Sequence, residues 1–178
     1  MTRKRRIAIF GGSFNPVHNG HTGLLRRAFD EFGLDAAIVI PAATSPFKKE
    51  TRQLPGELRL EMARAAFAGM PGVTIDGREI ERGGVSYAID TVRQIAAENR
   101  DAELIFLAGE DAIADVDKWK DSEELRRLCT FRALPRTEES STEARRRIAA
   151  GEPAGRFMPE AAAKLLDEYL KKSTSAKT

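Results

Sequence analysis

Cysteine, histidine and tryptophan are scarce in this chain of 178 residues, which holds one cysteine, two histidines and one tryptophan. The single Cys129 excludes an internal disulfide and is consistent with a reducing compartment. It lies in an apolar run, which favours a small core residue over a nucleophile. The two histidines could begin a zinc site only if carboxylates completed the ligand shell, because no other histidine and no nearby cysteine is present.

Long apolar runs and a strong net charge are also missing. No stretch approaches the roughly 20 apolar residues of a membrane span, and the apolar segment after the basic residues 3–6 is too short for a signal peptide. We therefore expect a cytoplasmic protein with no membrane partner. A net charge of +2 without a basic, aromatic-interleaved stripe also argues against nucleic acid. The length predicts one domain over 1–178, ending in a disordered tail at 173–178.

Short apolar segments alternate with amphipathic helical patterns along the chain. Strands are predicted at 7–10, 36–40, 73–75, 104–108 and 130–134. Helices are predicted at 19–32, 58–66, 87–96 with Ser86 as N-cap, 122–128, 140–150 and from Pro159 onward. Loops are predicted at 46–56 and 78–84. This alternation predicts an α/β fold, a Rossmann-like doubly wound parallel sheet of about five strands with helices on both faces and a helical C-terminus.

A glycine-rich turn at 11–21, with the sequence GGSFNPVHNGH, follows the first predicted strand and precedes the first predicted helix. Glycines let a phosphate approach the backbone, and the free N–H groups of a helix start attract anions. Both histidines of the chain, His18 and His21, fall in this one polar turn rather than scattered through the core. Phosphate contact is therefore favoured over metal ligation and over a purely structural role.

This turn resembles the H-x-G-H signature of the nucleotidyltransferases that join a nucleotide to a phosphate or acid and release pyrophosphate. Four further segments resemble bacterial nicotinate-nucleotide adenylyltransferases. They are RGGVSYAIDT at 82–91, G-x-D at 109–111 with Trp119 eight residues later, RLEM at 59–62 and SSTEAR at 140–145. The resemblance runs from about Ile7 to about Tyr169, and it implies transfer of the adenylyl group of ATP to nicotinate mononucleotide in NAD biosynthesis.

The resemblance also implies roles for individual residues. Its catalytic residues correspond to His18, His21 and Lys48. Its ATP-binding positions correspond to Gly11, Gly12, Ser13, Phe14, Gly20, Gly109, Asp111, Ser141, Thr142 and Arg145. Its nicotinate mononucleotide-binding positions correspond to Ser86, Tyr87, Ala88 and Trp119. The expected cofactor is Mg²⁺, bound mainly through the ATP phosphates with no dedicated protein ligand. The partners are ATP and nicotinate mononucleotide, and a homo-oligomer is left open.

Three departures from the family pattern leave alternatives open. Ala88 stands where the family has threonine, and Phe47 replaces a histidine beside Lys48. Only residues 137–139 separate Pro135-Arg136 from the late serines, where the family has a longer segment with another strand. Ser141 is expected to cap the helix that follows. The alternatives are an adenylyltransferase for nicotinamide mononucleotide or another phosphate acceptor, or a non-catalytic nucleotide-binding relative.

Overall fold

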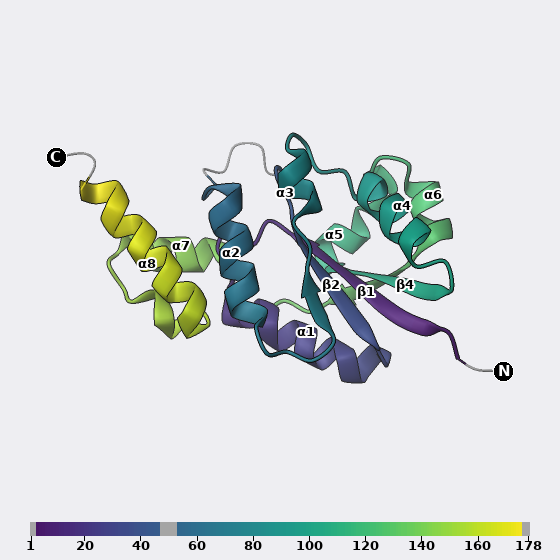
Figure 1. Cartoon of the computed structure of the whole chain (residues 1–178), viewed down its shortest axis with the longest axis horizontal. Coiled ribbons are helices and arrows are strands. Elements are labelled where there is room, and N and C mark those ends of the chain that lie inside the picture. The colour runs from purple at the N-terminus through teal and green to yellow at the C-terminus, as the bar shows by residue number, and fades with distance from the viewer. Residues whose placement is uncertain (1–2, 47–52, 176–178) are drawn as a thin grey trace.

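The computed structural model describes residues 3–46 and 53–175. Within these ranges one parallel sheet is built from β1 (Arg5–Gly12), β2 (Ala36–Pro41), β3 (Val73–Ile75), β4 (Ala102–Gly109) and β5 (Thr130–Leu134). The strand order is β3-β2-β1-β4-β5, which confirms the predicted doubly wound sheet (Figure 1). The order reverses between β1 and β4, and ligands of such sheets bind beyond the carboxyl ends of the strands at this point.

Helices cover both faces of the sheet (Figure 1). The helices of the described residues are α1 (Asn19–Phe32), α2 (Gly56–Phe67), α3 (Arg78–Arg82), α4 (Ala88–Glu98), α5 (Glu110–Ala114), α6 (Ser122–Leu128), α7 (Ser141–Ala149) and α8 (Glu160–Ser175), with 3-10 turns η1 (Val116–Lys118) and η2 (Ala154–Arg156). Helix α8 packs on α2 rather than on the sheet (Figure 1). Side chains of β1 alternate between two cores, as strand geometry requires. Ala8 and Phe10 belong to the core on the side of α1 and α2, to which α8 adds residues through its packing on α2, whereas Ile7 and Ile9 belong to the core on the side of α4 and α6.

Local sequence signals explain most of these boundaries. Gly33 ends α1 in a left-handed conformation with φ of 58°, and the amide of Leu34 bonds back to the Phe29 carbonyl. Burial of β1 and β4 on both faces fits their near-continuous apolar runs. Cys129 is buried in the core beside α4 and α6, as predicted, and burial raises its thiol pKa to about 12.

Four predicted details are wrong. Residues 78–82, predicted as loop, form α3, because this short helix buries Glu79 and half-buries Ile80 among exposed charged residues. Tyr87, not Ser86, is the N-cap residue of α4, and Ser140, not Ser141, caps α7 through a bond from the Glu143 amide of 3.1 Å. Helix α8 continues to Ser175, into the predicted disordered tail. No helix within the described ranges is long and apolar enough to cross a membrane.

Candidate active site

The turn between β1 and α1 lies at the switch point of the sheet. Phe14 adopts a left-handed backbone with φ of 42°, and a cis peptide bond joins Asn15 to Pro16. The Phe14 ring is buried against Phe10 and Phe67, with centroid distances of 5.4 and 6.3 Å. Of the predicted ATP-binding residues in this turn, Phe14 can therefore offer a ligand only its main chain. Gly11, Gly12 and Ser13 are partly exposed.

The two histidines stand side by side at the start of α1. Their ring centroids are 3.7 Å apart, with 33° between the ring planes. The Nδ1 atom of His21 accepts a hydrogen bond of 3.1 Å from the His18 amide. The proton of neutral His21 therefore lies on Nε2, where it can be donated to a phosphate oxygen. The two histidines predicted to supply one phosphate site therefore lie in direct contact.

His18 is the more deeply buried of the pair, with 5% of its surface exposed. Burial lowers its pKa from 6.5 to about 4, and the nearby Glu139 carboxylate opposes that shift. His18 is therefore neutral at physiological pH. Its Nδ1 has no hydrogen-bond partner among the residues that the structure describes. A buried, unsatisfied ring nitrogen costs free energy, which a bound polar group would recover.

The position of His18 leaves no room for a side chain at Gly20. A Cβ atom at Gly20 would lie 2.9 Å from His18 Nδ1 and 2.5 Å from Thr137 Oγ1. Both distances are shorter than a carbon contact allows. The glycine of the H-x-G-H sequence therefore makes room for the imidazole and for the short segment that precedes α7.

Helix α7 reaches the same turn from the far end of the chain. Ser141 Oγ donates to the Pro16 carbonyl at 3.0 Å, and Arg145 donates to the Asn15 carbonyl at 2.6 Å and to Thr142 Oγ1 at 3.1 Å. The late serine–arginine motif therefore lies beside the phosphate turn, as its predicted role requires. In this conformation Ser141 and Arg145 bind the backbone of the turn, so they also hold it in shape.

A cavity of about 180 Å³ opens between His18 and α7. Its lining includes Glu139, Ser140, Arg147 and Arg156. Arg147 is paired with Glu143 at 2.8 Å, and Arg146 binds the same carboxylate. These two arginines lower the pKa of Glu143 to about 2, so this carboxylate is ionised throughout the neutral range.

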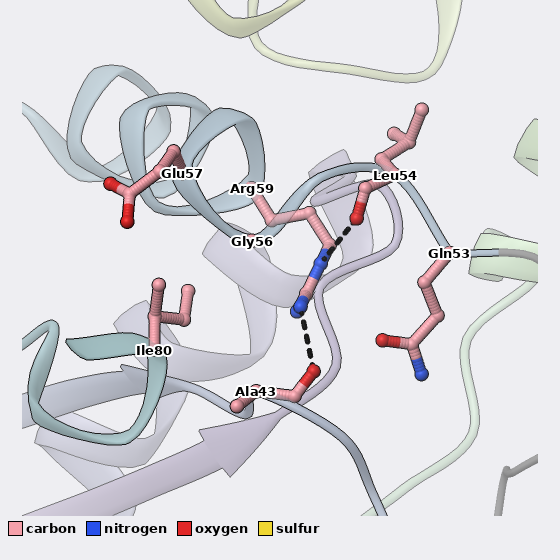
Figure 2. Close-up of a pocket in the computed structure, with 7 residues that line it drawn as sticks. All are labelled: Ala43, Gln53, Leu54, Gly56, Glu57, Arg59 and Ile80. Carbon is pink, nitrogen blue, oxygen red and sulfur yellow. Dashed lines mark hydrogen bonds between the residues drawn. The ribbon is translucent and has the colours of Figure 1, made fainter. Parts of the chain in front are cut away.

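Arg59 supports the site from beneath. Its side chain is 1% exposed and donates to four main-chain carbonyls, at Leu54 (3.0 Å), Ser13 (2.7 Å), Ala42 (2.7 Å) and Ala43 (3.0 Å). One guanidinium thereby fixes the phosphate turn to the loop after β2. Figure 2 shows it pointing from α2 toward Ala43 at a cavity of about 340 Å³. The resemblance of residues 59–62 marked this position without indicating its role.

Asp111 does not cap a helix, because Gly109 is the N-cap residue of α5. The Asp111 carboxylate instead pairs with Arg136, and both side chains are largely exposed. Asp111 and Gly109 do lie at the carboxyl end of β4, next to β1, where a nucleotide ribose is expected. Arg136 was missed because only the folded sheet brings the residues after β5 next to α5.

The predicted acceptor side is formed by Tyr87, Ala88 and Trp119. Tyr87 is 36% exposed, and Ala88 begins α4. Trp119 is half-buried, with its ring edge-on to Phe106 at 5.6 Å and to Phe131 at 6.0 Å. Trp119 thus packs partly buried against the core beside α4 and α6, and its stacking on a flat ring stays a prediction.

Ser86 is not oriented as a substrate ligand. Its hydroxyl accepts from the Ala43 amide at 3.0 Å and bonds to the buried carboxylate of Glu79. Glu79 also accepts from Thr91 at 2.5 Å, and burial is the main reason that its pKa is raised. This network, which sequence reasoning missed, anchors the loop before α4 to the end of β2. Ser86 therefore positions Tyr87 and Ala88.

The remaining predictions concern Lys48 and a bound metal ion. Lys48 lies outside the described residues, as does Phe47. No cluster of three or more histidine, cysteine or carboxylate side chains that could hold a metal ion occurs within 3–46 and 53–175.

Comparison with known proteins gives concordant results. The model of a family described as cytidylyltransferase-like matches residues 9–175. A protein of Citrifermentans bemidjiense named "Probable nicotinate-nucleotide adenylyltransferase" is 38% identical over 165 residues, which cover 91% of this chain and 74% of that protein. A protein of Geobacter sp. strain M21 with the same name is 41% identical over 131 residues, 74% of this chain and 61% of its own length. Several such relatives are thus matched over less than two thirds of their length.

Solved structures share the fold. A crystal structure of a "Putative Nicotinate-nucleotide Adenylyltransferase" from Vibrio parahaemolyticus superposes with a TM-score of 0.76 at 21% identity, covering 91% of this chain and 98% of that one. Plasmodium falciparum nicotinic acid mononucleotide adenylyltransferase complexed with NaAD gives a TM-score of 0.71 at 14% identity, over 93% and 96% of the two chains. At these identities the structures establish the architecture alone.

Proposed function

The chain belongs to the cytidylyltransferase-like family, among relatives named nicotinate-nucleotide adenylyltransferases, and from that membership we propose that it transfers the adenylyl group of ATP to nicotinate mononucleotide. The products are nicotinate adenine dinucleotide and pyrophosphate. The observation that supports this proposal most directly is the stacked pair His18 and His21 at the switch point of the sheet. Nucleotide binding alone does not require two adjacent imidazoles there.

The reaction needs no activated side-chain nucleophile. An oxygen of the acceptor's 5′-phosphate attacks the α-phosphorus of ATP, a new phosphorus–oxygen bond forms, and the bond to the β-phosphate oxygen breaks. The electron pair of that bond leaves with pyrophosphate. Catalysis therefore consists of aligning two anionic substrates and compensating the charge that develops between them.

The residues present are suited to those two tasks. His21 Nε2–H and the His18 imidazole would donate to phosphate oxygens at the start of α1. Arg59, Ser141 and Arg145 hold the turn that carries them. Gly109 and Asp111 would contact the ATP ribose, and Tyr87, Ala88 and Trp119 would surround the pyridine ring. Lys48 is proposed, from the family resemblance, as a further phosphate contact.

Mg²⁺ is proposed to enter with ATP, bound by phosphate oxygens and water, and to supply charge compensation at the leaving pyrophosphate. The side chains of His18, His21 and Arg145 at the turn can meet phosphate oxygens, which is the protein contact that this mode of binding requires. Protein groups would then act on the phosphates, and the cation would not need a cage of its own.

The test is pyrophosphate release with ATP and Mg²⁺, measured separately with nicotinate and nicotinamide mononucleotides. Wild-type protein should release pyrophosphate fastest with nicotinate mononucleotide, and the dinucleotide should appear in equal amount by chromatography. His18→Ala should lower kcat by roughly 10²–10³, the usual effect of removing one preorganised donor to a reacting phosphate or oxyanion. No pyrophosphate with either pyridine nucleotide would refute the proposal.

A further inference from the structure

A carboxylate shares the cavity beside α7 with the buried ring nitrogen of His18. Glu139 and His18 both line this cavity of about 180 Å³. The segment that carries Glu139 runs along the Nδ1 edge of the imidazole, because the position of a Cβ atom at Gly20 lies 2.9 Å from His18 Nδ1 and 2.5 Å from Thr137 Oγ1. The Thr137 hydroxyl donates to the Glu139 carbonyl at 2.6 Å, which ties the two residues together. The fold thus places Glu139 on the side of the nitrogen that has no partner among the described residues.

The other ionisable groups around His18 contribute less negative charge on that side. They are His21 on α1, Glu138 before α7, Glu143 and Arg147 on α7, and Arg156 in η2. Glu143 and Arg147 compensate each other in an ion pair of 2.8 Å. Glu139 is exposed and belongs to no ion pair in the part of the chain that the structure describes. Its charge is the one that raises the pKa of His18 against the effect of burial.

Bound ATP would change the balance that keeps His18 neutral. If His18 donates through Nε2 to a phosphate oxygen, any second proton must lie on Nδ1, which is the edge that faces the Glu139 segment. An imidazolium between a phosphate and a carboxylate is stabilised by both anions. A charged donor forms a hydrogen bond roughly twice as strong as a neutral one, and it compensates more of the charge on the reacting phosphates.

We propose that Glu139 is a positioning residue whose carboxylate holds a proton on His18 Nδ1 when ATP binds, so that His18 meets the phosphates as an imidazolium. The proton comes from solvent, forms an N–H bond at Nδ1, and returns to solvent when the products leave. No bond of the substrates forms or breaks in this step. The inference rests on the proposed function, because it assigns the charge of His18 during that reaction.

The first test follows the single-turnover rate of adenylyl transfer to nicotinate mononucleotide from about pH 5 to about pH 9. The wild-type rate should fall as pH rises through the pKa of His18 in the ATP complex. Glu139→Gln should move this fall to lower pH by roughly half a unit to one unit, the effect of one nearby exposed charge. Its rate should then be about threefold to tenfold below wild type in alkali and equal to it in acid. Glu139→Asp keeps the charge and should retain most of the wild-type profile.

Glu138→Gln is the matched control, because it removes the same charge from the adjacent residue at the same cavity. Its pH profile should match that of wild type. A loss in Glu139→Gln that is equal at every pH would indicate a structural role and overturn the inference. An unmoved profile, or an equal shift in Glu138→Gln, would overturn it as well.

Nuclear magnetic resonance reads the charge of His18 without turnover. In complexes with Mg²⁺ and α,β-methylene-ATP, which cannot be cleaved at the reacting bond, the pKa of His18 should be higher in wild type than in Glu139→Gln by the same half to one unit. Equal values in the two proteins would contradict the proposed role of Glu139. Wild-type protein that releases no pyrophosphate with either pyridine nucleotide would instead refute the proposed function, and this comparison would still decide whether Glu139 charges the histidine.

Discussion

Protonation of His18 should destabilise the folded protein in mild acid. Burial lowers the pKa of this imidazole from 6.5 to about 4. The unfolded chain therefore takes up a proton between pH 6.5 and pH 4 that the folded chain does not bind. Stability rises with pH wherever the unfolded state binds more protons, so the contribution is complete above pH 6.5 and is lost progressively as pH falls.

The size of the effect follows from the same two values. Each pKa unit corresponds to 1.36 kcal/mol, so a difference of about 2.5 units should cost about 3 kcal/mol of unfolding free energy at pH 4. The unfolded chain also protonates carboxyl groups in this range, and Glu143 is one whose pKa the folded chain lowers to about 2. The effect of His18 is isolated as the stability difference between wild type and His18→Asn, measured by urea unfolding at pH 7, 6, 5 and 4.

Nuclear magnetic resonance provides a direct check. With two histidines in the chain, the imidazole signal that disappears in His18→Asn identifies His18. That signal should remain in its neutral position until the pH approaches 4. Titration of the His18 signal near pH 6.5 in the folded protein would refute the burial argument. A stability difference between wild type and His18→Asn that does not change with pH would refute it as well. Added ATP should raise the pKa, because phosphate oxygens favour the protonated ring.

Two structural predictions concern the scaffold of the site. Gly20→Ala should lower the unfolding free energy by about 1–3 kcal/mol and reduce kcat, because the new methyl overlaps His18 Nδ1. Gly23→Ala on the same helix meets no atom within 4 Å and should be neutral or slightly stabilising; equal melting temperatures for both variants would contradict this reasoning. Arg59→Lys should cost about 3 kcal/mol, or roughly 6–12 °C in Tm, because lysine cannot reach four carbonyls. The exposed Arg64→Lys on the same helix should stay within about 1 °C, and a similarly small shift for Arg59→Lys would count against a supporting role.

Sequence reasoning predicted the sheet because its strands carry their own signal. The buried runs in β1, β2 and β4 are apolar throughout, and helical periodicity separates them. Helix α3 lacks such a signal, because its buried face includes a carboxylate, Glu79. Glu79 is stable there only because Thr91 and Ser86 come from other segments to bond it. A local pattern cannot show partners that folding brings together.

The residues of the candidate site also differ in whether their partners are close or distant in sequence. Residues 11–21 form one continuous motif, so the histidine pair could be predicted from the sequence alone. Arg59 and Arg136 act through residues that are distant in sequence, Ser13 and Asp111, and their roles required the folded chain. Ser86 was assigned to the substrate because the family motif includes it, whereas its hydroxyl bonds inward to Glu79.

The short connection before α7 is long enough to bring that helix to the phosphate turn. Residues 135–140 join β5 to α7, and six extended residues span up to about 20 Å. β5 lies two strands from β1, a separation of about 10 Å, so the connection can reach the phosphate turn without an added strand. Ser141 and Arg145 accordingly bind the carbonyls of Pro16 and Asn15. Glu139, in the same connection, raises the pKa of His18 against the effect of burial, so this segment acts on the histidine as well as positioning α7.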